Sequence, residues 1–245
     1  MEGSAAPPPS VAFVCAMPME LAPLTKALSL RTRTDGPVAM SVGKIGTRPV
    51  VAIVTGMGTK LASAGVEQLL DAVEVERVVV VGITGALDDE TPIGALVRPE
   101  AVVDGATGAE FRPDPLGTET PRGKMWTSDS LITDPETLAG LRRDGVVSLD
   151  METAAVAAVC RRHGIPWSVV RAISDRASDG SVNDEVFHLS NQDGTPNAKA
   201  VASYMAKHPG RIPAMARMAK SARLATERAA DEAIALVTEL PGASG

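Results

Sequence analysis

Three acidic residues of this chain stand where one predicted element ends or another begins. Glu152 lies in the first turn of a predicted alanine-rich helix, Asp175 ends an apolar strand, and Glu20 lies early in a helix that follows another strand. Each has a structural alternative: Glu152 would complement the helix dipole, Asp175 would cap the next element, and Glu20 would be solvated. Carboxyl groups gathered at one point can accept hydrogen bonds from a small molecule and carry protons. Their shared position at element boundaries favours one common site.

The elements that would position these acids alternate between strand and helix. Short apolar runs predict buried strands at 11–17, 49–58, 77–87, 95–104 and 167–175, and residues 125–133 are predicted to be a strand and a turn. Helical spacing predicts helices at 18–28, 59–73, 134–145 and 150–164, and one or two amphipathic helices over 198–208 and 212–240. Residues 105–124 and 176–197 are loop by composition. This alternation predicts an α/β fold: a single-domain three-layer sandwich with a mostly parallel, twisted central sheet and helices on both faces.

The carboxyl ends of the strands are where ligands bind in such sheets, and the three acids are expected at that edge. Two glycine turns fall there as well, "TGMG" at 55–58 and "GITG" at 82–85. They could cradle a phosphate through backbone N–H groups, or they could be tight strand-to-helix turns. Neither matches G-x-G-x-x-G or the phosphate-binding lysine pattern, so the tight-turn interpretation is favoured.

The composition excludes several classes of function. The chain has 245 residues and a net charge of −6, which argues against a nucleic-acid or membrane partner. Cys15 and Cys160 lie in apolar runs and the histidines are scattered, so we expect no metal and no cofactor. The Pro-rich residues 1–10 predict a disordered leader before one domain over 11–240. Without signal-peptide order or an apolar run of roughly 18 residues, we expect a soluble, cytoplasmic protein.

Three blocks of the sequence carry a family resemblance. They are "VAFVCAMPMELAPL", "VVVVGITGALDDETPIGALVRPEAVVD" and "SLDMETAAVAAVCRRHGIPWSVVRAISD". Their order and spacing resemble the nucleoside phosphorylase and nucleosidase superfamily, closest to the methylthioadenosine/S-adenosylhomocysteine nucleosidases. The resemblance runs from about Val11 to about Asp179 and implies the nucleoside phosphorylase-like fold. The C-terminal "HPGRIPAMARMAKSARLATERA" is similar to the branch linked to adenosylhopane cleavage.

The resemblance implies roles for the acids. In that family the methionine–glutamate pair beginning this helix holds the ribose, so Glu152 would accept hydrogen bonds from the 2′ and 3′ hydroxyls and Met151 would pack on the sugar. The acid after "RAIS" is the family's general acid, so Asp175 would protonate or hydrogen-bond purine N7, with Ser174 orienting it. Glu20 falls where the hydrolases place the base that activates water.

The chain departs from the family pattern at the second glycine turn and at the base site. The hydrolases have a serine where this chain has Ile83, and the hydroxyl of Thr84 stands next to it. The aromatic residue that stacks on the base is replaced by Leu131, followed by Ile132. Phe187, in the loop after the general acid, could close over the purine or pack in the core.

Three functions stay open at this level. The leading one is hydrolysis of a purine nucleoside, of the 5′-substituted adenosine type (methylthioadenosine, S-adenosylhomocysteine or 5′-deoxyadenosine), to adenine and a free sugar, with a nucleosidase of the adenosylhopane type as an alternative within this reaction. A phosphorylase would need groups that hold a dianion. The bacterial hexameric phosphorylases place arginine or serine where this chain has Glu20, Val80 and Ile83, which favours hydrolysis. A non-catalytic nucleoside-binding protein is the third. The resemblance also implies a homodimer or larger homo-oligomer.

Overall fold

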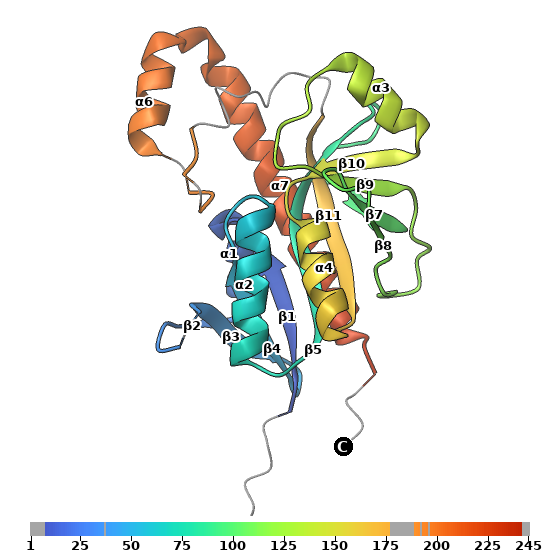
Figure 1. Cartoon of the computed structure of the whole chain (residues 1–245). Helices are drawn as coiled ribbons and strands as arrows, with labels where there is room; N and C mark the ends of the chain where they lie inside the picture. Colours follow the sequence, from blue (N-terminus) through green and yellow to red (C-terminus); the bar gives the residue numbers. More distant parts are fainter. Residues whose placement is uncertain (1–7, 37, 177–188, 192, 196, 242–245) are drawn as a thin grey trace, which may run out of the picture.

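The computed structural model describes residues 8–36, 38–176, 189–191, 193–195 and 197–241, and one large sheet forms its centre (Figure 1). The strands are β1 (Ser10–Cys15), β2 (Arg31–Arg33), β3 (Met40–Ile45), β4 (Arg48–Val54), β5 (Val75–Ala86), β6 (Leu96–Val97), β7 (Ala101–Asp104), β8 (Glu110–Phe111), β9 (Lys124–Thr127), β10 (Val146–Asp150) and β11 (Trp167–Arg176). The helices are α1 (Pro18–Leu28), α2 (Thr59–Ala72), α3 (Pro135–Arg143), α4 (Thr153–His163), α6 (Ala198–Lys207), the short 3₁₀ turn η1 (Pro209–Arg211) and α7 (Ile212–Thr238).

The sheet is mixed, and its longest pairing, between β5 and β11, is parallel. Strand β1 lies between β4 and β5, and β5 pairs with β11, all in parallel. The last residues of β5 also pair with β10, which runs antiparallel to it and continues the sheet through β9, β7 and β8. The carboxyl end of β10 therefore points back toward the middle of the molecule. The predicted three-layer α/β architecture is confirmed.

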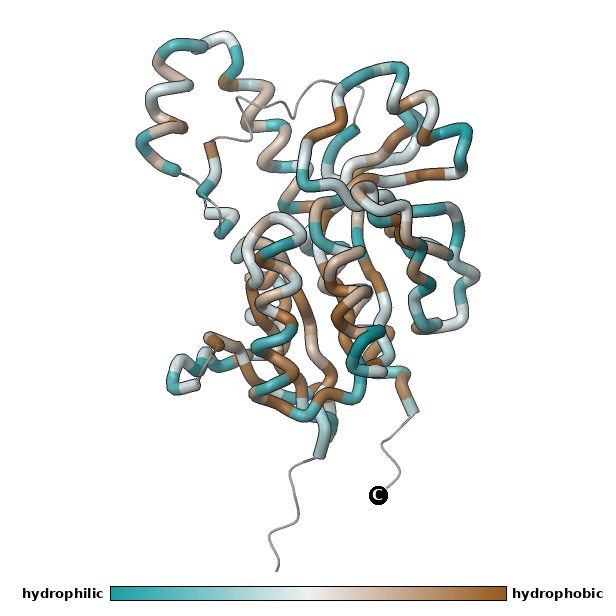
Figure 2. Tube along the Cα trace, viewed as in Figure 1, coloured by the Kyte–Doolittle hydropathy of each residue, from teal (hydrophilic) through white to brown (hydrophobic). Residues whose placement is uncertain are grey.

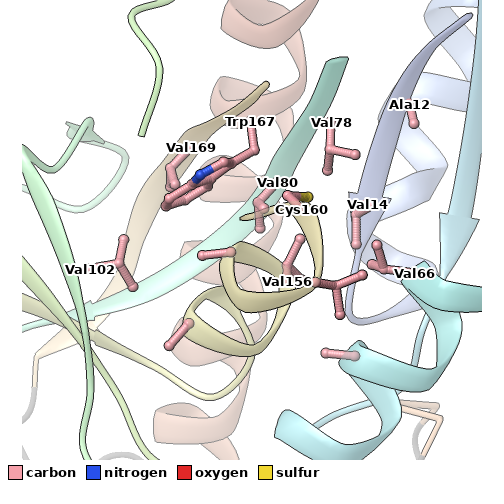
Figure 3. Close-up of a cluster of buried hydrophobic side chains, with 14 of the residues drawn as sticks. Ala12, Val14, Val66, Val78, Val80, Val102, Val156, Cys160, Trp167 and Val169 are labelled. Atoms are coloured by element: carbon pink, nitrogen blue, oxygen red, sulfur yellow. The ribbon is translucent and has the colours of Figure 1, made fainter. Parts of the chain in front are cut away.

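Two apolar clusters hold the layers together. Helices α2 and α4 cover one face, where Val66 and Val156 pack against the strands (Figure 3). Helices α1 and α7 cover the other face, where Leu24 and Ala229 pack against Phe13. Figure 2 shows hydrophobic positions where these helices meet the sheet and hydrophilic positions in the connecting loops. Both cysteines are buried and free, as the sequence predicted.

Several boundaries differ from the predicted ones. Strand β10 occupies the residues before α4, which begins at Thr153, whereas the sequence predicted a helix from Asp150. The predicted strand 95–104 is two strands, β6 and β7, and the expected loop 105–124 contains β8. Strands β2 and β3 were not predicted, and β1 begins at Ser10, inside the expected leader. These short strands are fixed by pairing with distant segments, which a local apolar pattern does not report.

Parts of the chain lie outside the described residues, including residues 1–7 and most of the predicted loop 176–197. Within the described part, helices of at least 18 residues that are apolar enough to cross a membrane are absent.

Candidate active site

A cavity of about 300 Å³ lies at the carboxyl ends of β1, β5 and β11, beside the last residues of β10. The predicted site residues that line it are Glu20, Ile83, Thr84, Leu131, Ile132, Met151, Glu152, Ser174 and Asp175. Phe187, the remaining predicted residue, lies outside the described residues. The fold thus brings together residues that are up to 155 positions apart (175 − 20).

Glu20 is buried, with 1% of its surface exposed, so it is not the solvated helix acid that remained open from the sequence. Its Oε2 accepts hydrogen bonds from the backbone N–H groups of Ala16 (2.8 Å) and Met17 (3.0 Å), and its Oε1 accepts one from Ile83 N–H (2.8 Å). Burial raises the pKa of the Glu20 carboxyl, while Arg171 and these backbone donors oppose the rise. A side chain at Gly82 would overlap the Glu20 carboxylate, so β5 needs a glycine there.

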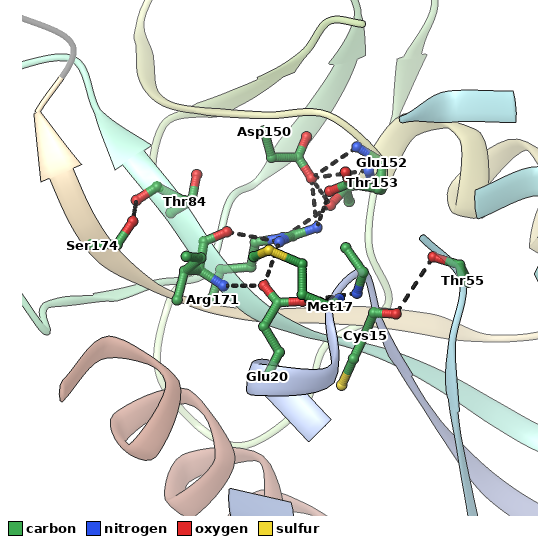
Figure 4. A network of polar contacts seen from close by, with 12 residues as sticks. Cys15, Met17, Glu20, Thr55, Thr84, Asp150, Glu152, Thr153, Arg171 and Ser174 are labelled. Atoms are coloured by element: carbon green, nitrogen blue, oxygen red, sulfur yellow. Dashed lines mark hydrogen bonds and ion pairs between the residues drawn. The ribbon is translucent and has the colours of Figure 1, made fainter. Parts of the chain in front are cut away.

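Arg171 is the centre of the charged part of the site, and the sequence analysis missed it. This guanidinium, 2% exposed, lies in β11 within reach of three carboxyl groups (Figure 4). Its Nη2 is 2.8 Å from Asp150 Oδ2 and 3.2 Å from Glu152 Oε2, and its Nη1 is 3.7 Å from Glu20 Oε1. Burial acts to lower the pKa of Arg171, but the three carboxylates outweigh it and keep the group charged.

Glu152 precedes the first turn of α4 at the N-cap position, with φ −133° and ψ −34°, and its side chain does not cap the helix. Its Oε1 accepts a hydrogen bond from Gly58 N–H (3.0 Å) and its Oε2 one from Arg171 (3.2 Å). The prediction of a first-turn acid was therefore wrong by one position. Burial raises the pKa of Glu152 to about 7, with Arg171 opposing the rise and Asp150 adding to it. A shift of this kind is frequent at functional sites.

Ser174 and Asp175 both line the cavity although they are neighbours in a strand. Regular alternation would direct them to opposite faces of the sheet, but the register of β11 against β5 shifts between Ile173 and Asp175. The Ser174 hydroxyl donates a short hydrogen bond to Asp175 Oδ1. Gly85 faces the other carboxylate oxygen, because a Cβ placed there would lie 3.2 Å from Asp175 Oδ2. The irregular strand end thus presents a hydroxyl–carboxyl pair to the cavity.

The second glycine turn, residues 82–85, contacts the charged groups of the site through backbone groups and not through hydroxyl groups. Ile83 donates its N–H to Glu20 and its carbonyl accepts a hydrogen bond from Arg171 Nη1 (2.7 Å). The Thr84 hydroxyl donates to the Leu149 carbonyl (2.7 Å) and so ties β5 to β10. The Thr84 proton is therefore engaged within the sheet and does not replace the donor that Ile83 lacks.

The described lining is acidic in its charged part and apolar elsewhere. Four carboxyl groups (Glu20, Asp150, Glu152 and Asp175) face two guanidinium groups (Arg171 and Arg176). Carboxylates accept hydrogen bonds from adjacent hydroxyls, and a buried acid can deliver or take up a proton. Five methionines, Leu131 and Ile132 supply apolar surface of the kind that contacts flat rings or alkyl groups. The arrangement suits a small molecule with a hydroxyl-bearing part and an apolar part.

The sequence matches a known protein family and several known proteins. A model of the phosphorylase superfamily matches residues 10–115 and 114–207. The chain is 28% identical over 200 residues to the 5′-methylthioadenosine/S-adenosylhomocysteine nucleosidase of Actinobacillus succinogenes, covering 69% of this chain and 86% of that protein. The nucleosidase of the same name from Haemophilus influenzae is 27% identical over 211 residues, covering 72% of this chain and 91% of that one.

Solved structures show the same fold. The Neisseria meningitidis nucleosidase in complex with methylthio-immucillin-A superposes with a TM-score of 0.70 at 17% identity, covering 95% of this chain and all of that one. The Streptococcus pyogenes S-adenosylhomocysteine nucleosidase in complex with 5-methylthiotubericidin gives 0.71 at 18% identity, covering 97% and 100%. The family match runs from β1 through β11 to the end of α6, which is well over half of the chain, and on this ground the chain belongs to the phosphorylase superfamily.

Proposed function

We propose that this protein hydrolyses the N-glycosidic bond of a 5′-substituted adenosine and releases adenine and a free sugar. The observation that carries the proposal is the convergence of Glu20, Glu152 and Asp175, each from a different element, on one cavity. Relatives and structural neighbours named as nucleosidases support it. The water oxygen forms a bond to C1′, the C1′–N9 bond breaks, and its electron pair leaves with the base.

Glu152 and Met151 hold the ribose in this proposal. Two adjacent hydroxyls donate to the Glu152 carboxylate, which accepts through both oxygens. Positive charge grows on the sugar as the bond to the base breaks, and the buried carboxylate stabilises that charge more than it stabilises the ground state. Met151 lines the cavity beside it and packs on the sugar.

Asp175 and Glu20 handle the protons. Asp175, oriented by Ser174, donates a proton or a hydrogen bond to N7, so that the base leaves as neutral adenine. Glu20 takes a proton from the attacking water. The backbone donors of Ala16 and Ile83 favour the ionised form of Glu20 that this step requires.

Hydrolysis fits the charges better than phosphorolysis does. A phosphate dianion needs cations, and the four carboxyl groups of the described lining outnumber its two guanidinium groups. Arg171, the more buried cation, already has three acidic neighbours. The same acids could bind a nucleoside in a protein that does not cleave it. A measurement of base release distinguishes that alternative from an enzyme.

A base-release assay across substrates tests the proposal. Methylthioadenosine, S-adenosylhomocysteine, 5′-deoxyadenosine, an adenosine with a long 5′ alkyl chain, adenosine and inosine are each incubated with and without phosphate. We expect adenine and a free sugar from at least one 5′-substituted adenosine, with no acceleration by phosphate and with loss of activity in Glu20→Gln. The 1-phosphate of the released sugar as the main sugar product would establish a phosphorylase, and adenosine binding without base release would establish a binding protein.

We also propose that the protein works as a homodimer or larger homo-oligomer in the cytoplasm. Helix α6 and the first turns of α7 stand clear of the sheet (Figure 1), and Ile212 is 41% exposed there. Met19, which lines the cavity, is 39% exposed, so the mouth has apolar surface that a second copy would cover. The free, buried cysteines suit a reducing compartment. Light scattering that gave a monomer at working concentration would contradict the assembly.

A further inference from the structure

Asp150 is a buried acid of the site that has no role in the reaction proposed above. It ends β10, and its side chain is 1% exposed. Its Oδ1 accepts a hydrogen bond from the Thr127 hydroxyl (2.6 Å), and its Oδ2 accepts from the Thr153 N–H (2.9 Å) and from the Thr153 hydroxyl. These donors come from β9 and from the start of α4, so the carboxylate is held from two sides.

Among the three acids around Arg171, Asp150 is the nearest. Its Oδ2 also lies 3.4 Å from the backbone N of Glu152, so one oxygen touches both the guanidinium and the chain at the ribose-binding acid. Thr127 adds to this, because its hydroxyl accepts a hydrogen bond from Ala154 N–H (3.0 Å). The free N–H groups at the start of α4 are therefore satisfied by β9 and β10 and need no ligand.

We propose that Asp150 is a positioning residue, whose carboxylate holds Arg171 and the start of α4 so that the Glu152 carboxylate stays available to the substrate hydroxyls. This inference rests on the proposed function, because it assigns Asp150 a part in the same site. Without the Asp150 charge, Arg171 keeps only Glu152 and Glu20 as acidic neighbours. The guanidinium would then pair more tightly with the group that should receive the ribose.

The charges that face Glu152 come from three packed elements. Arg171 faces it from β11, Asp150 from β10 and Glu20 from α1, and the neutral Gly58 N–H precedes α2. The negative charge of Asp150 disfavours ionisation of Glu152, and its removal should lower the pKa of Glu152 from about 7. An acid remote from Glu152 would not move this titration.

The kinetic test compares Asp150→Asn with Asp134→Asn. Asp134 caps α3 with the same pair of bonds, to Thr137 N–H (2.8 Å) and the Thr137 hydroxyl (2.6 Å), but it is exposed and does not line the cavity. Asp150→Asn should lower kcat/KM by about 10–10²-fold, mostly through KM, because a displaced binding group has costs of this order. Its acid limb of kcat/KM should move to lower pH by about one unit or more. Asp134→Asn should leave both unchanged, and an Asp150→Asn enzyme that behaved like it would overturn the proposal.

Thr127→Val is a second, milder variant in case Asp150→Asn does not fold. It removes the 2.6 Å bond that orients Asp150 but keeps the negative charge. The proposal predicts a higher KM with an unmoved acid limb. A Thr127→Val enzyme with a wild-type KM would contradict the positioning role.

A carbon-13 NMR titration separates this inference from the proposed function. The Glu152 carboxyl signal, assigned through its loss in Glu152→Gln, should titrate near pH 7 in the wild type and at clearly lower pH in Asp150→Asn. No turnover is needed, so the titration decides on Asp150 even if no nucleoside releases its base. Equal titration midpoints in the two proteins would overturn the inference while leaving a hydrolase assignment intact.

Discussion

The chemistry of this site depends on carboxyl groups that water reaches only in part. Glu20 and Glu152 are buried against one guanidinium, and that environment holds both of their pKa values above the ordinary range. Asp175 differs, since it lies at an irregular strand end beside a hydroxyl. The fold thereby gives chemically equal side chains different tasks, according to what surrounds each one.

Asp175→Asn should lower kcat by about 10²–10⁴-fold, the usual cost of losing a general acid. The amide keeps the shape and the hydrogen bond from Ser174 but has no proton to transfer, so substrate affinity should change little. Asp104→Asn is the matched control, because Asp104 ends β7 and bonds the Thr107 hydroxyl (2.7 Å) away from the cavity lining. Steady-state kinetics of the two variants decide, and an equal kcat in both would remove Asp175 from the mechanism.

Glu152→Gln should change how stability depends on pH. The folded pKa of Glu152, about 7, lies above the ordinary 4.5, so the folded chain binds this proton more tightly than the unfolded chain does. The stabilisation is full below pH 4.5 and is lost as the pH rises through 7. The variant should therefore gain stability relative to the wild type between pH 5 and pH 8, as measured by thermal unfolding.

Glu67→Gln provides a control of opposite sign. The Arg162 and His163 side chains lower the pKa of Glu67 from 4.5, so the wild type should gain a little stability relative to that variant as the pH rises to 4.5, and the difference should be flat between pH 5 and pH 8. If the stability difference between Glu152→Gln and the wild type did not change between pH 5 and pH 8, burial would not raise the pKa of Glu152.

The sequence pattern located the acids Glu152 and Asp175 but not the buried Arg171. Glu152 and Asp175 could be located from the sequence because a polar residue at the end of an apolar run is conspicuous. Arg171 was overlooked inside such a run, although its position there carried a signal: a cation in a continuously apolar strand is buried and must be paired. Its partners come from α1, β10 and the start of α4, and no local pattern identifies them.

At the scale of elements, β10 explains why the start of α4 was predicted wrongly and how Asp150 is held beside the cavity. The residues "VVSLD" are few, and the alanine-rich segment after them resembles a helix that starts at Asp150. Asp150 does bind the N–H of Thr153, as a helix cap would, but from the end of a strand that pairs antiparallel with the end of β5. That pairing is non-local, so the capping chemistry was predictable and the strand was not.

Gly82→Ala should lower activity, because Gly82 of β5 lies directly against the Glu20 carboxylate of α1. A methyl group on β5 at this position would overlap the Glu20 carboxylate, which reaches it from α1. The carboxylate must then leave its bond to the Ile83 N–H, and kcat should fall by about 10²-fold or more. Gly36→Ala is the control, because nothing lies within 4 Å of a Cβ there. Wild-type kinetics in Gly82→Ala would show that Glu20 does not act where the structure places it.

At the scale of the whole molecule, the end of the last helix is tied to the first residue of β4, at the end of the strands opposite the cavity. Arg48 of β4 donates hydrogen bonds to the carbonyls of Val237 (3.1 Å) and Leu240 (3.2 Å) and pairs with Glu76 (2.9 Å). The alternation of strands and helices predicted the layers that these bonds connect. It could not predict the mixed sheet, because pairing partners such as β5 and β10 are set by packing across the molecule.

Arg48→Ala should separate stability from activity. Loss of several hydrogen bonds to carbonyls near the end of α7 should lower the free energy of unfolding by about 1–3 kcal/mol. The cavity lies at the other end of the strands, so kcat/KM should stay at the wild-type value. Arg33→Ala, which removes an exposed pair with Asp35, should change neither quantity in thermal unfolding and kinetic assays. A large change in kcat/KM in Arg48→Ala would show that the contact between β4 and the end of α7 influences the site.

The cavity lining also makes the protein sensitive to oxidants. Of the ten methionines in the chain, five line the cavity: Met17, Met19, Met57, Met151 and Met218. Sulfoxide formation would turn these apolar contacts into polar ones, while Met40 and Met125 are buried in the core at 9% and 0% exposure. Under mild peroxide, peptide mass spectrometry should find the five oxidised before Met40 and Met125, with activity falling in step and a bound nucleoside analogue slowing both. A cell under oxidative stress would then lose this activity before the protein unfolds, and methionine sulfoxide reductases would restore it.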